Sequence, residues 1–166
     1  MKPSTKPSTK PGRAPRESHV TKTEIVLPSD ANNLGTVFGG RVMEWIDIAA
    51  AICANRHCRT TVVTASMDDL HFLAPIRAGM FVILEATLNY AGKTSVEVGV
   101  EVLSEEPSTG ARTRACAAYL TFVAVDAKGR PVAVPPLLPE TAEERRRHAE
   151  AEQRRRFRLE RRQAFR

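Results

Sequence analysis

The stretch Gly39-Gly-Arg-Val-Met-Glu-Trp-Ile-Asp47-Ile-Ala-Ala-Ala-Ile-Cys-Ala-Asn-Arg56 decides the fold of this 166-residue chain. Apolar residues occupy nearly every side of the helix that it would form, which predicts a buried helix instead of one lying on the surface. Three alanines at 49–51 would let a sheet approach the helix backbone closely. Arg56 and His57 suit its last turn, where cations meet unpaired carbonyl groups.

Asp47 is the only ionisable side chain in the apolar segment 46–54, apart from one cysteine thiol. A carboxylate in apolar surroundings loses its hydration and must be compensated by nearby groups. Gly39 and Gly40 stand where the helix begins, and a helix N-terminus offers unpaired N–H donors. A carboxylate near such donors is typical of a catalytic site. The alternative is that Asp47 only bonds a neighbouring backbone or arginine group.

Outside this helix, several segments are rich in β-branched residues and are bounded by Pro, Gly or Ser turns. They are residues 21–27, 60–67, 81–90, 94–103 and 112–125. Most of them follow one another through short connections. The pattern therefore predicts an α+β fold in which an antiparallel sheet of about five to six strands wraps around one long central helix.

The composition divides the chain into three parts. Residues 1–18 are rich in Pro, Ser, Thr and basic groups, so we expect a disordered basic tail. Residues 19–136 would form the domain, and 137–166 an Arg/Glu-rich helical tail. This charged C-terminal helix opens with a capping box made by Thr141 and Glu144. It could be solvated, pack against another subunit or bind nucleic acid.

The net charge of +6 lies in the two tails, and the residues between them are slightly acidic. Aromatic residues make up only 5% of the chain, which argues against stacking on nucleic-acid bases. No apolar run approaches the roughly 20 residues needed to cross a bilayer, and the N-terminus shows no signal-peptide pattern. We therefore expect a cytoplasmic protein with neither nucleic acid nor membrane as a partner.

Other kinds of catalytic site find little support. No serine lies in a GxSxG turn, no Walker loop is present, and Phe38-Gly39-Gly40 lacks the GxGxxG spacing. The three cysteines and four scattered histidines form no zinc pattern, so we expect no metal. We interpret Cys53, Cys58 and Cys116 as free thiols in a reducing compartment.

Asp47, the glycine pair and the amide of Asn32 together offer the groups needed to hydrolyse an ester or thioester. An N–H of Gly39 or Gly40 would polarise the carbonyl, and Asp47 would act as a general base on water or as a nucleophile. Asn32 would align the water. Taken alone, however, an asparagine in a turn is usually structural.

The segment Asp30-Ala-Asn32-Asn-Leu-Gly35-Thr-Val-Phe-Gly-Gly40-Arg-Val-Met-Glu-Trp-Ile-Asp47 closely resembles the opening of the hotdog-fold acyl-CoA thioesterases. The nearest groups are the YciA-type and the cytosolic and brown-fat-type acyl-CoA hydrolases. The resemblance covers roughly residues 22–160 and includes segments 62–68, 71–76, 92–95 and 119–126. It implies a hotdog fold and an acyl-CoA thioesterase that produces free fatty acid and CoA.

The resemblance also implies roles for individual residues. Asp47 and Asn32 match the family's catalytic aspartate and asparagine, and Gly39 and Gly40 match the helix start whose backbone faces the thioester carbonyl. The family's active site lies at a dimer interface, so Asn32 and Asp47 of one site would come from different subunits. Such dimers commonly assemble into a trimer of dimers. No cofactor is implied, because coenzyme A is part of the substrate.

Substrate-binding residues follow from the same resemblance. Lys93, Thr94 and Ser95 match the segment that approaches the CoA nucleotide and pantetheine arm in similar proteins. Phe38 and Thr64 complete the expected set.

This chain departs from many relatives at Ala74, where they carry a basic residue. The departure would weaken the phosphate contacts or shift them to Arg77 or Lys93. Two alternatives to a thioesterase stay open. One is a non-catalytic acyl-CoA or nucleotide-binding hotdog protein, and the other is a hydratase or dehydratase. The latter relatives use a histidine near the helix, whereas the only histidine in this helix is His57 at its far end.

Overall fold

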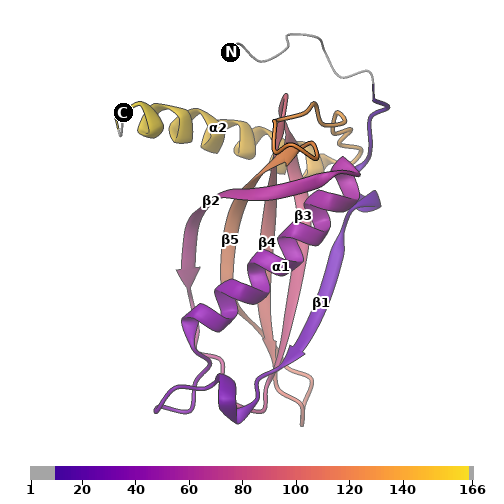
Figure 1. The fold of residues 1–166 in the computed structure, drawn as a ribbon. Coiled ribbons are helices and arrows are strands. Elements are labelled where there is room, and N and C mark those ends of the chain that lie inside the picture. Colours follow the sequence, from indigo (N-terminus) through magenta and orange to yellow (C-terminus); the bar gives the residue numbers. More distant parts are fainter. Residues whose placement is uncertain (1–9, 165–166) are drawn as a thin grey trace.

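Five strands form one antiparallel sheet in the computed structural model, which describes residues 10–164. Their order across the sheet is β1-β3-β4-β5-β2 (Figure 1). The strands are β1 (Val20–Ile25), β2 (Thr61–Phe72), β3 (Phe81–Ala91), β4 (Ser95–Glu105) and β5 (Arg112–Val125). Two short 3-10 helices, η1 (Pro15–Glu17) and η2 (Pro28–Asp30), flank β1. The predicted α+β arrangement is confirmed, and every predicted strand is present.

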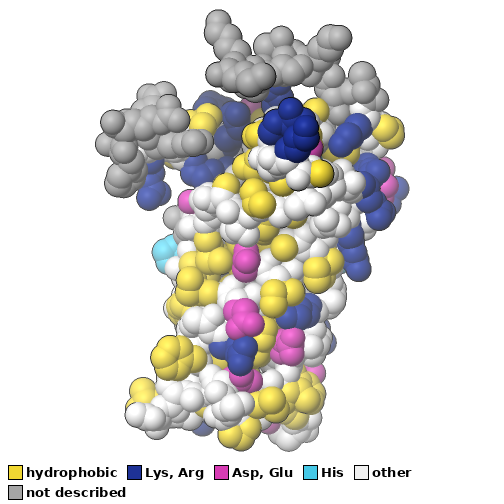
Figure 2. All heavy atoms as spheres, viewed as in Figure 1, with side chains coloured by type: hydrophobic (Ala, Val, Ile, Leu, Met, Phe, Trp, Pro, Cys, Tyr) yellow, Lys and Arg dark blue, Asp and Glu magenta, His cyan; other side chains and the backbone are white. Residues whose placement is uncertain are grey.

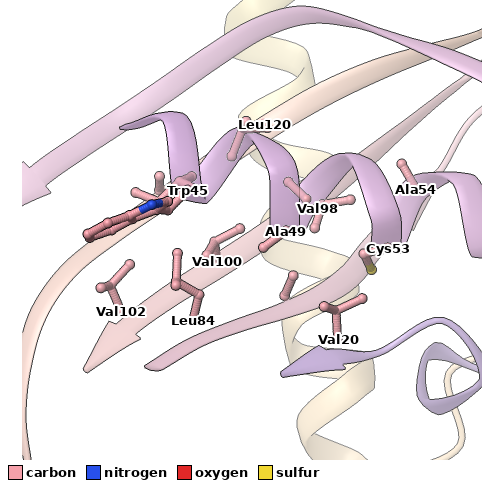
Figure 3. Close-up of a cluster of buried hydrophobic side chains, with 14 of the residues drawn as sticks. Val20, Trp45, Ala49, Cys53, Ala54, Leu84, Val98, Val100, Val102 and Leu120 are labelled. Atoms are coloured by element: carbon pink, nitrogen blue, oxygen red, sulfur yellow. The ribbon is translucent and has the colours of Figure 1, made fainter. Parts of the chain in front are cut away.

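Helix α1 (Gly39–Cys58) lies across one face of this sheet (Figure 1). It ends at Arg59, whose left-handed backbone (φ 53°) lets its N–H donate to the Asn55 carbonyl at 2.8 Å. One side of the helix packs with strand side chains in the core (Figure 3). The buried residues of α1 are Val42, Trp45, Ile46, Ala49, Ala50, Cys53, Ala54, His57 and Cys58.

The prediction that α1 is buried on nearly all sides is wrong for the single chain. Met43, Ile48 and Ile52 lie on its outer side and are 40%, 40% and 39% exposed. The physical reason is that the sheet covers only one face of the helix, and no second layer within residues 10–164 covers the other. Figure 2 shows hydrophobic side chains exposed on the face of the molecule that carries α1.

Strand β2 contains two bulges that change which way its side chains point. Thr64 is opposite Phe122 and Ser66 is opposite Thr121, so Ala65 is an extra residue without a partner in β5. Side chains of a regular strand alternate between faces, and one extra residue reverses the alternation. Thr64 therefore points to the face that carries α1, and Asp68 points to the opposite face. A second shift lies between Asp68 and His71.

Part of the segment predicted to be a disordered tail is ordered. Residues 10–18 contain η1, and the backbone of Arg13 pairs with Leu137. The Arg13 guanidinium donates to the carbonyls of Arg56 and His57, each at 3.0 Å. Those carbonyls belong to the last turn of α1, where cations are stabilising. Residues 1–9, the rest of the predicted tail, lie outside the described residues.

Helix α2 (Ala142–Ala164) crosses the sheet face opposite α1 (Figure 1). Its capping box is confirmed, since the Glu144 N–H donates to Thr141 Oγ1 at 3.1 Å and a Glu144 oxygen accepts from the Thr141 N–H at 2.9 Å. Along α2, the His148 ring lies against the Tyr90 ring of β3, tilted by 42°, and Arg158 reaches Asp68 of β2. The helix therefore runs from β3 to the β2 edge of the sheet. No helix within residues 10–164 is long and apolar enough to cross a membrane.

Candidate active site

Asp47 and Thr64 are brought together by α1 and β2. Asp47 is half-buried two turns into α1, and the Thr64 hydroxyl donates to its Oδ1 at 2.9 Å. The reversal at Ala65 lets Thr64 face the helix. Sequence reasoning named both residues, one as catalytic and one as substrate-binding, but not their hydrogen bond. The bond fixes one carboxylate oxygen and leaves the other oxygen available to a reactant.

The start of α1 presents unpaired backbone donors. Phe38 is exposed at the N-cap position, and its side chain makes no cap bond. The N–H groups of Arg41 and Val42 return to the Phe38 carbonyl at 2.9 and 3.3 Å. Within residues 10–164, no acceptor is found for the N–H groups of Gly39 and Gly40. These donors stand where an oxyanion could be stabilised.

A pocket of about 360 Å³ opens beside Gly39. Its walls come from the loop before α1, from Phe72 at the end of β2, and from the segment that follows β2. The lining residues are Thr36, Val37, Gly39, Phe72, Leu73, Ala74, Pro75 and Ile76. A Cβ on Gly39 would lie 3.4 Å from the Phe72 ring, which is van der Waals contact, so Phe72 borders the helix start closely.

Asn32 is committed to its own loop in the single chain. Its Oδ1 accepts hydrogen bonds from the N–H groups of Leu34 (2.9 Å) and Thr36 (3.3 Å), and its Nδ2 donates to Thr36 Oγ1 at 3.0 Å. Within one protomer, Asn32 therefore stabilises its own turn, as asparagines in turns usually do. Because a side-chain amide has two N–H donors, one remains for a further partner. Within the described part of the chain, no hydrogen bond joins Asn32 to Asp47.

Within one chain, the structure places Lys93, Thr94 and Ser95 far from the Asn32 loop and the start of α1. Ser95 is nevertheless in register, through Val123 of β5, with Val63, the residue before Thr64. Thr36, in the Asn32 loop, pairs with Arg77 just before β3 begins, whereas Lys93 follows the end of β3. An 11-residue strand at about 3.3 Å per residue separates the two ends by roughly 30–35 Å. Lys93 is exposed on this hairpin, and its carbonyl accepts from the Val134 N–H at 3.1 Å.

Sequence reasoning missed the ion pair that joins the Asn32 loop to α1. Asp30 is only 7% exposed, and its Oδ1 accepts from Arg41 Nε at 2.8 Å. Arg41 also binds Glu44 at 2.7 Å, and these two carboxylates raise its pKa. The backbone carbonyl of Asp30 accepts from the Phe38 N–H at 2.8 Å. The only available signal was that Asp30 and Arg41 both lie in the recognised segment.

The cysteines lie away from Asp47 and are buried free thiols, as predicted. Burial raises the pKa of Cys53 to about 12 and that of Cys58 to about 11, so both are poor nucleophiles. The described residues contain no cluster of His, Cys, Asp and Glu that could hold a metal ion. A larger groove of about 810 Å³ lies under α2 on the other face of the sheet and contains none of the predicted site residues.

Comparisons with known proteins identify the family and the fold of this chain. A family model described as the thioesterase superfamily matches residues 34–111. YkhA, an uncharacterized acyl-CoA thioester hydrolase of Bacillus subtilis, is 49% identical over 139 residues, covering 84% of this chain and 81% of that protein. A hexameric acyl-CoA thioesterase crystallised in its apo form has a TM-score of 0.88 and 40% identity, covering 92% of this chain and 97% of the other.

A Staphylococcus aureus acyl-CoA hydrolase has been solved in complex with butyryl-CoA, CoA and CoA disulfide. It has a TM-score of 0.84 and 38% identity, covering 93% of this chain and 97% of the other. Variants of that protein with alanine in place of one aspartate, one asparagine or one threonine have also been solved. The superpositions confirm the predicted hotdog fold.

Proposed function

Because this chain belongs to the thioesterase superfamily, we propose that it hydrolyses fatty acyl-CoA thioesters to free fatty acid and CoA. The observation that carries the proposal is the Asp47 carboxylate, oriented by Thr64 and lying in the same helix whose first N–H groups are unpaired. A base and an oxyanion-binding site are the two elements that hydrolysis of a thioester requires.

In this mechanism, the N–H of Gly39 or Gly40 donates to the thioester carbonyl oxygen. Asp47 removes a proton from water, the water oxygen bonds to the carbonyl carbon, and the C–S bond then breaks to release CoA as the thiolate, which takes up a proton. Attack by Asp47 itself, through an anhydride that water then hydrolyses, is the second route. Thr64 holds Oδ1, so Oδ2 is the oxygen that acts in either route.

Three variants of the Staphylococcus aureus relative support these assignments. The aspartate, asparagine and threonine replaced there are separated along that chain by the same intervals as Asn32, Asp47 and Thr64 here. Asn32 would align the attacking water with its remaining N–H. Every step uses protein groups and water, and CoA enters only as part of the substrate.

The proposed active site is completed by a second copy of this chain. No hydrogen bond joins Asn32 to Asp47 within residues 10–164 of one protomer, and the Lys93 hairpin lies at the end of β3 far from the Asn32 loop. Strand β2 is an edge of the sheet, and Val63 on it is 47% exposed. A dimer formed along this edge would cover exposed residues of α1 and bring in Asn32 of the partner. The hexameric relative supports a trimer of such dimers.

CoA would bind with its thioester at the α1 start, near Phe38, and its nucleotide near the hairpin of the partner. Lys93 would contact a phosphate, and Thr94 and Ser95 would border the pantetheine arm. An exposed lysine at a hairpin can neutralise phosphate charge without a large desolvation cost. Arg77 is also exposed, but it lies at the same end of the sheet as the α1 start.

The test is release of free thiol from a panel of straight-chain acyl-CoA substrates. We expect turnover by the wild-type protein and a loss of at least roughly 100-fold in kcat for Asp47→Asn, the usual contribution of a general base. Glu44→Gln removes one charge from an exposed position of the same helix and should keep its activity. Calorimetric binding of CoA without hydrolysis of any acyl-CoA would instead identify a non-catalytic acyl-CoA-binding protein.

A further inference from the structure

Strand β2 connects the site to the opposite face of the sheet. Thr64 and Asp68 are four residues apart, so a regular strand would point both to the same face. The extra residue Ala65 sends Thr64 toward Asp47 and Asp68 toward α2. The position of the Thr64 hydroxyl therefore depends on how the bulge is held in place.

An ion cluster on the α2 side holds this segment. Arg158 donates to Asp68 Oδ2 and to Glu97 Oε2, each at 3.0 Å. Glu97 is 1% exposed, and its other oxygen accepts from Arg154 at 2.8 Å. Arg154 also lies over the Tyr119 ring at 3.7 Å. Charge pairs shielded from water in this way are stronger and more sensitive to geometry than exposed pairs.

Strand β2 needs such an anchor more than the other strands do. It lies at the edge of the sheet, so only β5 pairs with it among the described residues, and that pairing is interrupted on both sides of Asp68. Each bulge removes regular ladder hydrogen bonds, which lowers the cost of a shift along the strand. Arg158 ties the short segment between the two bulges to Glu97 in the centre of the sheet.

We infer that Arg158 of α2 is a positioning residue for the catalytic pair, acting through Asp68 and the Ala65 bulge to hold the Thr64 hydroxyl against Asp47. Arg158 is 18% exposed and lies on the opposite face of the sheet from the reacting atoms. Its effect on the reaction would pass only through Thr64. This inference rests on the proposed thioesterase function.

Arg158→Gln tests the inference, with Arg156→Gln as the matched control on an exposed position of the same helix. Arg154 continues to pair with Glu97 and to cover Tyr119, so α2 stays docked in the Arg158 variant. We expect kcat for acyl-CoA hydrolysis to fall about tenfold while KM changes less than about twofold. Arg158→Lys, which keeps the charge, should recover part of kcat. Asp68→Asn should reproduce the loss from the other side of the pair.

A double-mutant cycle with Thr64→Val separates positioning from a general structural effect. If Arg158 acts through Thr64, Arg158→Gln causes little further loss of kcat in the Thr64→Val protein. Hydrogen exchange should also rise in residues 61–72 of Arg158→Gln and not in Arg156→Gln. The inference would be overturned if the double variant lost kcat by the product of the two single losses. An unchanged kcat in Arg158→Gln would also overturn it.

The same assay separates this inference from the proposed function. A folded wild-type protein that hydrolyses no acyl-CoA contradicts the function, and with it the positioning role. A wild-type protein that hydrolyses acyl-CoA, together with an Arg158→Gln variant of equal kcat, contradicts the positioning role alone.

Discussion

The two helices contact opposite faces of one sheet by different physical means. Helix α1 packs on the sheet through apolar side chains such as Trp45 and Ile46, which are 6% and 0% exposed. Helix α2 is held by Arg154 and Arg158 on the buried carboxylate of Glu97. Apolar burial is non-directional, whereas a buried ion pair depends on its geometry and on both partners. Helix α1 therefore completes the hydrophobic core, whereas α2 is attached to particular residues of the strands through ion pairs.

Removing a core side chain from α1 should have the largest effect on stability. Ile46→Ala leaves a cavity where the side chain is fully buried, so we expect the free energy of unfolding to fall by roughly 2–5 kcal/mol. Denaturant unfolding monitored by circular dichroism would measure it. Leu159→Ala on α2, where the side chain is 43% exposed, is the control and should cost less than about 1 kcal/mol. If both variants lost a similar free energy of unfolding, α1 would not contribute more apolar packing to stability than α2 does.

Breaking the α2 cluster should cost somewhat less. Glu97→Gln leaves Arg154 and Arg158 facing each other without their shared carboxylate, and losing one partner of a buried pair costs about 3 kcal/mol. Asp68 remains to pair with Arg158, which limits the loss. The same unfolding measurement applies, with Glu101→Gln as a control because that glutamate, in the same strand, is about half exposed. Equal stability of the Glu97 variant and wild type would show that α2 does not depend on this cluster.

The smallest expected effect is a pH dependence at the end of α1. His57 is fully buried, its Nε2–H donates to the Pro135 carbonyl at 2.9 Å, and burial, reinforced by the nearby Arg13 charge, lowers its pKa. The hydrogen bond to the Pro135 carbonyl and, more weakly, the Glu17 carboxylate oppose this lowering of the pKa only in part. In the unfolded chain, His57 therefore takes up a proton near pH 6.5, whereas in the folded protein it stays neutral at that pH. Stability should fall as the pH drops below about 6.5, by at most about 1.4 kcal/mol per pH unit.

Unfolding free energies of wild type and His57→Gln between pH 5 and 8 would test this dependence. The variant should show a shallower slope below pH 6.5, while His71→Gln, which removes an exposed histidine of β2, should keep the wild-type slope. An unchanged slope in His57→Gln would assign the pH dependence to other groups.

Much of the fold could be predicted from local patterns. Helix α1, the strands and the capping box at Thr141 each depend on residues close together in the chain, and all are confirmed. Burial on the outer side of α1 could not be judged correctly, because the apolar pattern does not tell whether the cover comes from the same chain. The ordered contact of Arg13 with the end of α1 also depends on residues distant in sequence.

The candidate site shows the same limit. Asp47, Asn32 and the glycine pair were found because a charge stands in an apolar helix and because the segment is recognisable. The Thr64–Asp47 bond could not be predicted, since it requires a strand whose alternation is reversed once. Glu97 alternates with valines in β4, as a solvent-facing residue would, and nothing local indicates that two arginines about 60 residues later bury it.

The unpaired residue in β2 has a consequence for the evolution of the chain. Ala65 is exposed, and its side chain makes no specific contact within the described residues, so substitutions there should be tolerated. Because β5 has no partner for Ala65, its deletion would leave a regular pairing in which Thr64 and Asp68, then three residues apart, still point to opposite faces. Both a substitution and a deletion at this position are compatible with the site. In homologues, this position should therefore vary in residue type and also in length.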